Sequence, residues 1–134
     1  MAKRILLVED NPASLELMRY LLHSAGHEVL LATNGQEAIQ HLSRQLPDMV
    51  LTDIQMPVVD GYALLAHIRG DARTGALPVV ALTAYSMPGD EERVMGAGFD
   101  AYLAKPIDPE TILQDVDALL ARIVPHRGSG VGLD

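Results

Sequence analysis

Residues 4–12 read Arg4-Ile5-Leu6-Leu7-Val8-Glu9-Asp10-Asn11-Pro12, an apolar run that passes through two acids straight into a helix start. The four aliphatic side chains predict a strand that is buried on both faces. Asn11 followed by Pro12 is typical of a helix N-terminus, because Asn caps free backbone N–H groups and proline suits the first helical turn. This stretch therefore predicts a strand, two carboxylates at its carboxyl end, and a helix.

The same unit of strand and helix repeats along the chain. The predicted strands are Arg4–Val8, Glu28–Ala32, Asp48–Thr52, Pro78–Thr83 and Ala101–Ala104. The predicted helices cover 12–25, 35–45, 61–69, 88–97 and 109–124, with further start signals at Asn34-Glu37 and Asp108-Pro109 and stops at Gly26 and Gly70. Because crossovers between parallel strands are right-handed, the alternation predicts an α/β fold. We expect a doubly wound, five-stranded parallel sheet in the flavodoxin-like order 2-1-3-4-5.

The composition is that of one globular domain. The 134 residues are 49% hydrophobic and 21% charged, and no apolar stretch is long enough to span a membrane. The absence of cysteine and of a signal peptide favours a cytoplasmic protein, and a net charge of -8 disfavours nucleic acid as a partner. We expect a domain over 3–124 and a flexible tail or linker stub over 125–134. A free-standing protein and a piece of a longer protein both fit.

Polar residues follow four of the five predicted strands, at the points where the apolar runs end. They are Glu9 and Asp10, then Asp53, Thr83 and Lys105. Strands 1 and 3 are neighbours in the predicted order, so the acids should meet at one edge of the sheet. Three carboxylates in contact repel one another unless a cation lies between them. Mg²⁺ is the expected cofactor, with Asp10 and Asp53 as direct ligands and Glu9 acting through water.

Asp53 can itself act as a nucleophile toward phosphorus, which gives an aspartyl phosphate. Such chemistry needs positive charge beside the transferring group. Lys105, one of only two lysines in the chain, is placed to supply it. The backbone carbonyl of Gln55, two residues past Asp53, is placed to add a metal ligand.

Five elements resemble the response-regulator receiver family of two-component signalling, in order and spacing, over residues 3–124. These elements are Glu9-Asp10, Asp53 with Met56-Pro57 and Gly61, Thr83-Ala84, Tyr102, and Lys105-Pro106. The resemblance implies that a phosphohistidine donor phosphorylates Asp53 in a Mg²⁺-dependent reaction. It also implies that Thr83 is the switch hydroxyl, Tyr102 a rotating aromatic and Lys105 the phosphate-binding ammonium, followed by a cis bond to Pro106.

Such a domain is a signalling phosphoacceptor that catalyses its own phosphorylation and slow dephosphorylation, rather than an enzyme with a separate substrate. The resemblance places Gln55 and Tyr85 where they would tune the hydrolysis. An apolar face of the first helix, formed by Ala13, Leu17 and Tyr20, is the expected docking site for a sensor histidine kinase or histidine phosphotransferase. A downstream target is expected on the fourth helix, fifth strand and fifth helix. Single exposed apolar side chains are common, so the first-helix face also fits an ordinary surface.

Several of these residues have ordinary structural interpretations. Asp10 fits a helix entry, Thr83 a β-former, and Tyr102 simple core packing. Two other functions also suit the fold. A flavin or nucleotide binder would need a phosphate-cradling loop after the first strand, where this chain carries acids that repel phosphate. A phosphatase with an Asp nucleophile commonly has a second acid two residues later, where this chain has Gln55.

Overall fold

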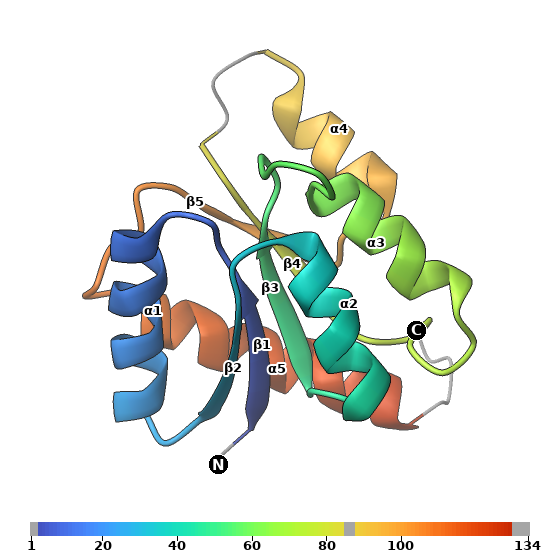
Figure 1. Cartoon of the computed structure of the whole chain (residues 1–134). Coiled ribbons are helices and arrows are strands. Elements are labelled where there is room, and N and C mark those ends of the chain that lie inside the picture. Colours follow the sequence, from blue (N-terminus) through green and yellow to red (C-terminus); the bar gives the residue numbers. More distant parts are fainter. Residues whose placement is uncertain (1–2, 85–87, 130–134) are drawn as a thin grey trace.

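Five strands and five helices alternate along the chain, as the sequence predicts (Figure 1). The computed structural model describes residues 3–84 and 88–129, with residues 122–129 described by their backbone alone. The strands are β1 (Arg4–Val8), β2 (Glu28–Ala32), β3 (Met49–Asp53), β4 (Val79–Thr83) and β5 (Ala101–Ala104). The helices are α1 (Pro12–Ser24), α2 (Gly35–Arg44), α3 (Gly61–Gly70), α4 (Asp90–Ala97) and α5 (Ile112–Ser129).

The strands form one parallel sheet in the order β2-β1-β3-β4-β5, which confirms the predicted flavodoxin-like order. The β3–β4 register aligns Asp53 with Leu82, and the β4–β5 register aligns Thr83 with Ala104. The carboxyl ends of β1, β3, β4 and β5 therefore reach one edge of the sheet. β5 is an outer strand, and its second side has no strand paired to it in the described part of the chain.

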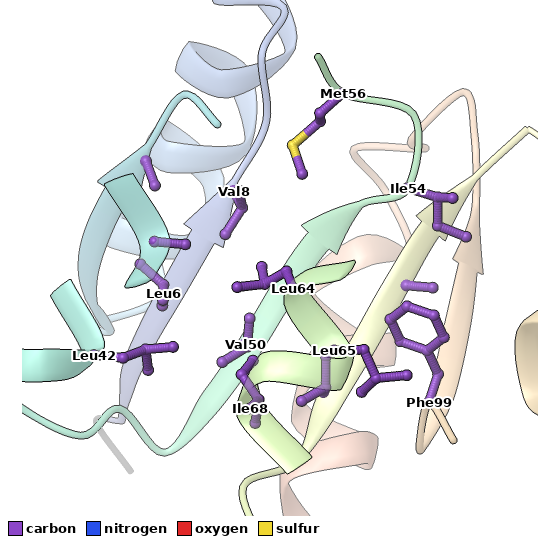
Figure 2. Close-up of a cluster of buried hydrophobic side chains, with 14 of the residues drawn as sticks. Leu6, Val8, Leu42, Val50, Ile54, Met56, Leu64, Leu65, Ile68 and Phe99 are labelled. Carbon is purple, nitrogen blue, oxygen red and sulfur yellow. The ribbon is translucent and has the colours of Figure 1, made fainter. Parts of the chain in front are cut away.

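Helices cover both faces of the sheet, because successive strand residues point to opposite sides. α1 and α5 pack on one face, over a core that includes Ile5 and Leu7 of β1. α2, α3 and α4 pack on the other face, over a core that includes Leu6 and Val8 of the same strand (Figures 1 and 2). Burial on both faces explains why the strand sequences are continuously apolar rather than alternating.

The helix start signals act largely as predicted. The Asn11 side-chain oxygen accepts a hydrogen bond from the Ser14 N–H at 3.0 Å, which caps α1. Asn34 caps α2 by accepting from the Glu37 N–H at 2.8 Å. The Glu37 carboxylate accepts from the Thr33 N–H at 2.7 Å, one residue earlier than a standard capping box requires.

The predicted bounds of β3 and α5 differ from the observed ones. β3 covers Met49–Asp53 instead of 48–52, so Asp53 is its last residue, and the Asp48 carboxylate just before it accepts a hydrogen bond from the Arg4 N–H at 2.7 Å. Asp108 does not cap a helix at residue 109. Its carbonyl accepts from the N–H groups of Thr111 and Ile112 in a turn, and α5 begins at Ile112. α5 then continues to Ser129, so the predicted tail over 125–134 is helical as far as that residue.

α4 buries little of its side-chain surface against the rest of the domain. Val94 is its only buried residue. Gly89 precedes it in a left-handed conformation and forms no side-chain cap, and Gly98 follows it in a second left-handed conformation. The prediction that α4 starts at residue 88 was two residues early. A helix of eight residues with so little buried apolar surface is expected to move readily.

Arg69 of α3 holds the chain that follows α4. Its guanidinium donates to the Leu77 carbonyl at 2.6 Å, to the Gly98 carbonyl at 3.2 Å and to the Asp100 carboxylate at 2.9 Å. Asp100 also accepts from the Val79 N–H at 2.8 Å. One side chain thus joins α3, the start of β4 and the loop between α4 and β5.

Candidate functional site

The carboxyl edge of the sheet brings together the polar residues that the sequence predicted there. Glu9 directly follows β1 and leads into Asp10, and Asp53 is the last residue of β3. Thr83 ends β4. Lys105 follows β5, and its N–H donates to the Thr83 carbonyl at 2.8 Å. Four strand ends thus place three acids, a hydroxyl and an amine at one edge of the sheet.

Glu9, Asp10 and Asp53 form an acid cluster, in which one oxygen of each carboxylate lies within 4.8 Å of the others. Glu9 is 1% exposed and Asp53 8%, whereas Asp10 faces solvent. The Lys105 Nζ lies 2.9 Å from Glu9 Oε1 and 3.1 Å from Asp53 Oδ2. Three carboxylates and one ammonium leave the ionised site with an excess of negative charge.

The electrostatics of the cluster follow from burial and from these pairings. Burial raises the pKa of Glu9, the charge of Asp53 adds to the effect, and the hydrogen bonds from Lys105 and the Asn11 N–H only partly offset it. Burial alone would lower the pKa of Lys105. The hydrogen bond to Glu9 and the charge of Asp53 outweigh burial and raise that pKa, so Lys105 stays a cation.

The donor set fits a hard divalent cation. Glu9 Oε1 is sealed from solvent, and the positive group beside it is the Lys105 ammonium, which it shares with Asp53. A second positive charge would relieve the remaining repulsion. The exposed position of Asp10 leaves one side of the cluster open to solvent, and Mg²⁺ usually keeps several of its waters. The acid cluster could therefore hold the ion that the sequence predicts.

A cavity of about 230 Å³ opens beside Asp53. Its lining includes Thr83, Lys105 and Gln55, so the structure brings these predicted residues to the carboxylate. Asp90, the first residue of α4, also lines the cavity and was not predicted to belong to the site. The hydroxyl, the ammonium and the carboxylate thus border one space in which an anion could be held.

Gly61 allows α3 to start directly against the strand that carries Asp53. A Cβ at Gly61 would lie 2.6 Å from the Asp53 carbonyl oxygen and 2.7 Å from the Ile54 Cα. The Gly61 N–H donates to the Ile54 carbonyl at 2.8 Å, and Asp60 caps α3 by accepting from the Ala63 N–H at 2.8 Å. The loop after Asp53 is therefore closed at both ends by backbone contacts that a larger residue would disrupt.

Within this loop, Val58 occupies the centre of a γ-turn. The Val59 N–H donates to the Pro57 carbonyl at 2.8 Å, and Val58 has a φ of 67°. Positive φ is strained for a β-branched residue. The Val58 side chain is 93% exposed, so no packing compensates for this strain. The turn lies just beyond Gln55, whose carbonyl is the predicted metal ligand.

Tyr102 lies on β5 and is half-buried against the core under α3 and α4. Its hydroxyl donates a hydrogen bond to Glu91 Oε2 of α4 at 2.8 Å. The sequence analysis singled out Tyr102 but missed Glu91. Glu91 stands among three consecutive acids at a helix N-terminus, where acids are favoured in any case, so no sequence signal distinguishes it.

Two further predictions concern surface groups and the backbone. Leu17 and Tyr20 of α1 are 40% and 62% exposed, and Ala13 of the same helix is also exposed. The bond between Lys105 and Pro106 is cis, as the family resemblance implies. Tyr85 lies outside the described residues. No helix in the described part of the chain has the length and apolar character needed to cross a membrane.

The sequence matches the response regulator receiver domain family over residues 5–117, which is most of the chain. The chain belongs to this family. A curated relative, the polar-differentiation response regulator DivK of Brucella anthropi, is 36% identical over 120 residues, which cover 90% of this chain and 98% of DivK. The chain is thus a receiver domain of the kind used in two-component signalling, with the general role of a phosphoacceptor.

Two solved receiver domains share its architecture. The signal receiver domain of a histidine kinase from Syntrophus aciditrophicus has a TM-score of 0.81 and 33% identity, covering 98% of this chain and 94% of that one. The receiver domain of a sensor histidine kinase from Pseudomonas aeruginosa has a TM-score of 0.80 and 35% identity, covering 93% and 99%. The latter structure has a magnesium ion coordinated in its active-site cleft.

Proposed function

We propose that this receiver domain accepts a phosphoryl group on Asp53 from a phosphohistidine donor and uses Mg²⁺ to do so. The observation that supports this best is the setting of Asp53. Its carboxylate is buried, lies 3.1 Å from the Lys105 ammonium, and stands within 4.8 Å of two further carboxylates. This arrangement combines a nucleophile, a fixed cation and ligands for a second cation around one cavity.

In the transfer, a carboxylate oxygen of Asp53 forms a bond to phosphorus while the bond between phosphorus and the donor's imidazole nitrogen breaks. The imidazole leaves with the bonding electron pair. Asp10 and Asp53 would hold Mg²⁺ directly, with Glu9 acting through water and the Gln55 carbonyl as a further ligand. The bound ion supplies charge neutralisation to the phosphoryl oxygens. Lys105 would hold one of these oxygens, since its raised pKa keeps it charged.

Hydrolysis reverses the modification without a separate substrate. Water attacks phosphorus, the bond to the Asp53 oxygen breaks, and the free carboxylate and inorganic phosphate result. The same cations that favour transfer to Asp53 favour this step, so the domain would catalyse both its own phosphorylation and its slow dephosphorylation. Gln55 is exposed at the mouth of the cavity and is placed to influence the approach of that water.

Phosphorylation would be read out through Thr83, α4 and Tyr102. Thr83 borders the same cavity as Asp53, so its hydroxyl could donate to a phosphoryl oxygen by moving inward. The space that it leaves would admit the ring of Tyr102, and the surface formed by α4, β5 and α5 would change shape. Few contacts hold α4, with Val94 its only buried residue, which suits it to such a shift.

Two partner surfaces follow from this scheme. Ala13, Leu17 and Tyr20 are exposed apolar groups on α1, the helix that follows Asp10, and suit docking of a histidine kinase or histidine phosphotransferase. The surface of α4, β5 and α5 suits a downstream target, since it carries the residue that is expected to rotate.

The test is phosphorylation by a small-molecule phosphodonor in Mg²⁺, with the label located by mass spectrometry. We expect one phosphoryl group on Asp53, none on Asp53→Asn, and loss of labelling in EDTA. Glu28→Gln removes an exposed acid at the amino end of β2, the edge of the sheet opposite the cluster, and serves as the control, which should label like wild type. Labelling of Asp53→Asn at the wild-type rate, or labelling that EDTA does not reduce, would refute the proposal.

A further inference from the structure

A groove of about 490 Å³ runs along β5 between α4 and α5. Its floor is the outer strand of the sheet, residues 101–104, and its walls include Met95 of α4 and Leu119 of α5. Met95 is 41% exposed and adds an accessible apolar side chain to the wall of the groove. The groove therefore combines apolar side chains with the backbone edge of an outer strand and is open to solvent.

The charged side chains that line this groove in the described part of the chain are acidic. Asp115 of α5 and Asp100 are part of its lining, and Glu91 lies one helical turn before Met95, on the same face of α4. Asp100 is balanced by Arg69 at 2.9 Å. Among the side chains that the structure describes, the groove lining includes no lysine or arginine. An apolar floor with acids at its margins is complementary to a partner that is apolar and positively charged.

Glu91 is also hydrogen-bonded to a residue that lines the groove. It accepts the hydrogen bond of the Tyr102 hydroxyl at 2.8 Å, and Tyr102 lines the groove. The carboxylate therefore has an internal partner in this structure. A cation that pairs with Glu91 must compete with the Tyr102 hydroxyl for the carboxylate. Rotation of the Tyr102 ring into the core would break this hydrogen bond and leave Glu91 available to the cation.

We propose that the groove between α4 and α5 binds a cationic, apolar segment of the target protein, and that Glu91 is released from Tyr102 to pair with a cation of that segment. This inference rests on the proposed function, because phosphorylation of Asp53 is what draws Tyr102 inward. Binding and phosphorylation then favour each other, since both favour the state in which the bond between Glu91 and Tyr102 is broken.

The first experiment tests the chemistry of the partner. A synthetic amphipathic peptide of lysine and leucine is titrated into the 134-residue chain in Mg²⁺ and beryllium fluoride, a phosphoryl mimic, and binding is followed by fluorescence anisotropy. A peptide with glutamate in place of lysine is the comparison. We expect only the lysine peptide to bind, with amide NMR shifts along β5 and in α4. Equal binding of both peptides, or shifts elsewhere, would overturn the proposal.

Glu91→Gln should weaken binding of the lysine peptide by about 3-fold to 10-fold, the range typical of a partly desolvated ion pair. Glu28→Gln is the control, because it removes the same charge from an exposed position of β2, the outer strand at the other side of the sheet from β5. The control should change the affinity less than about 2-fold. Equal losses in the two variants would mean that the peptide responds to net charge alone, and the groove would not be its site.

Tyr102→Phe tests the competition for Glu91, because it removes the hydroxyl and keeps the charge. Without the phosphoryl mimic, this variant should bind the lysine peptide about 3-fold to 10-fold more tightly than wild type, as expected for loss of a hydrogen bond to a charged group. With the mimic, the difference should disappear. Equal affinities of the two proteins without the mimic would contradict the role assigned to Glu91.

The remaining outcomes separate this inference from the proposed function. Phosphate incorporation on Asp53 is measured in the same samples. If Asp53 is labelled but the lysine peptide fails to bind, the inference about the groove is wrong and the phosphoacceptor function stands. If sedimentation shows that the protein with the mimic forms dimers that Glu91→Gln abolishes, a second copy occupies the groove and the cationic partner is excluded.

Discussion

Asp53→Asn should make the metal-free protein more stable, although it removes an ion pair. At an effective dielectric constant of about 20, the attraction to Lys105 at 3.1 Å is worth about 5 kcal/mol. Repulsion from Glu9 and Asp10, with oxygens within 4.8 Å, amounts to about 3.5 kcal/mol each on the same scale. Solvent screens the exposed Asp10 and reduces its share of the repulsion. The substitution also removes the desolvation cost of burying the Asp53 charge, so the free energy of unfolding should rise by about 1–2 kcal/mol in total.

The assay is thermal unfolding of both proteins in EDTA and in MgCl₂. In EDTA, the variant should unfold roughly 3–10 °C higher than wild type, from about 1–2 kcal/mol in a domain of this size. Magnesium at ten times its dissociation constant should stabilise wild type by about 1.4 kcal/mol and the variant by much less. In MgCl₂, the difference in unfolding temperature between the variant and wild type should therefore become smaller or change sign. A variant that is less stable than wild type in EDTA would refute the charge argument.

Other predictions concern the residues around Asp53. Lys105→Ala should still bind Mg²⁺ but lose the phosphate-dependent NMR change, and an unaltered change would contradict its role. Magnesium affinity should fall as the pH falls through the raised pKa of Glu9, because protonation removes a ligand charge, and calorimetry across pH checks this. Val58→Gly should stabilise the fold by about 1 kcal/mol by relieving its positive φ, whereas Val58→Ala should gain little. Gly61→Ala should destabilise by more than about 2 kcal/mol in chemical denaturation, whereas Gly70→Ala, with open space around it, should not.

The sheet and its helices could be predicted from the sequence because each signal is local. The apolar run before Glu9 and the capping group at Asn11 depend on neighbours in the chain, and strand order follows from the handedness of crossovers. The acid cluster was predictable for the same reason, since parallel strands bring their carboxyl ends to one edge. The start of α5 was predicted wrongly, because the Asp108-Pro109 signal suits a turn as well as a helix cap.

Contacts between distant helices could not be predicted in this way. The pairing of Glu91 with Tyr102 and the place of Asp90 in the cavity depend on how α4 sits over the sheet. A row of acids at a helix start carries no information on which of them faces a tyrosine. Likewise, nothing in the sequence around Arg69 indicates that its guanidinium reaches Asp100, 31 positions later.

The Arg69 contacts have a consequence for how α4 can move. Arg69 binds the Gly98 carbonyl and Asp100 at the C-terminal end of the helix, whereas Gly89 at the other end forms no side-chain cap. A rigid helix that is held at one end moves mainly by rotating about that end. We therefore expect the displacement of α4 on phosphorylation to be smallest at Gly98 and to increase toward Asp90, where the Tyr102–Glu91 hydrogen bond would have to break first.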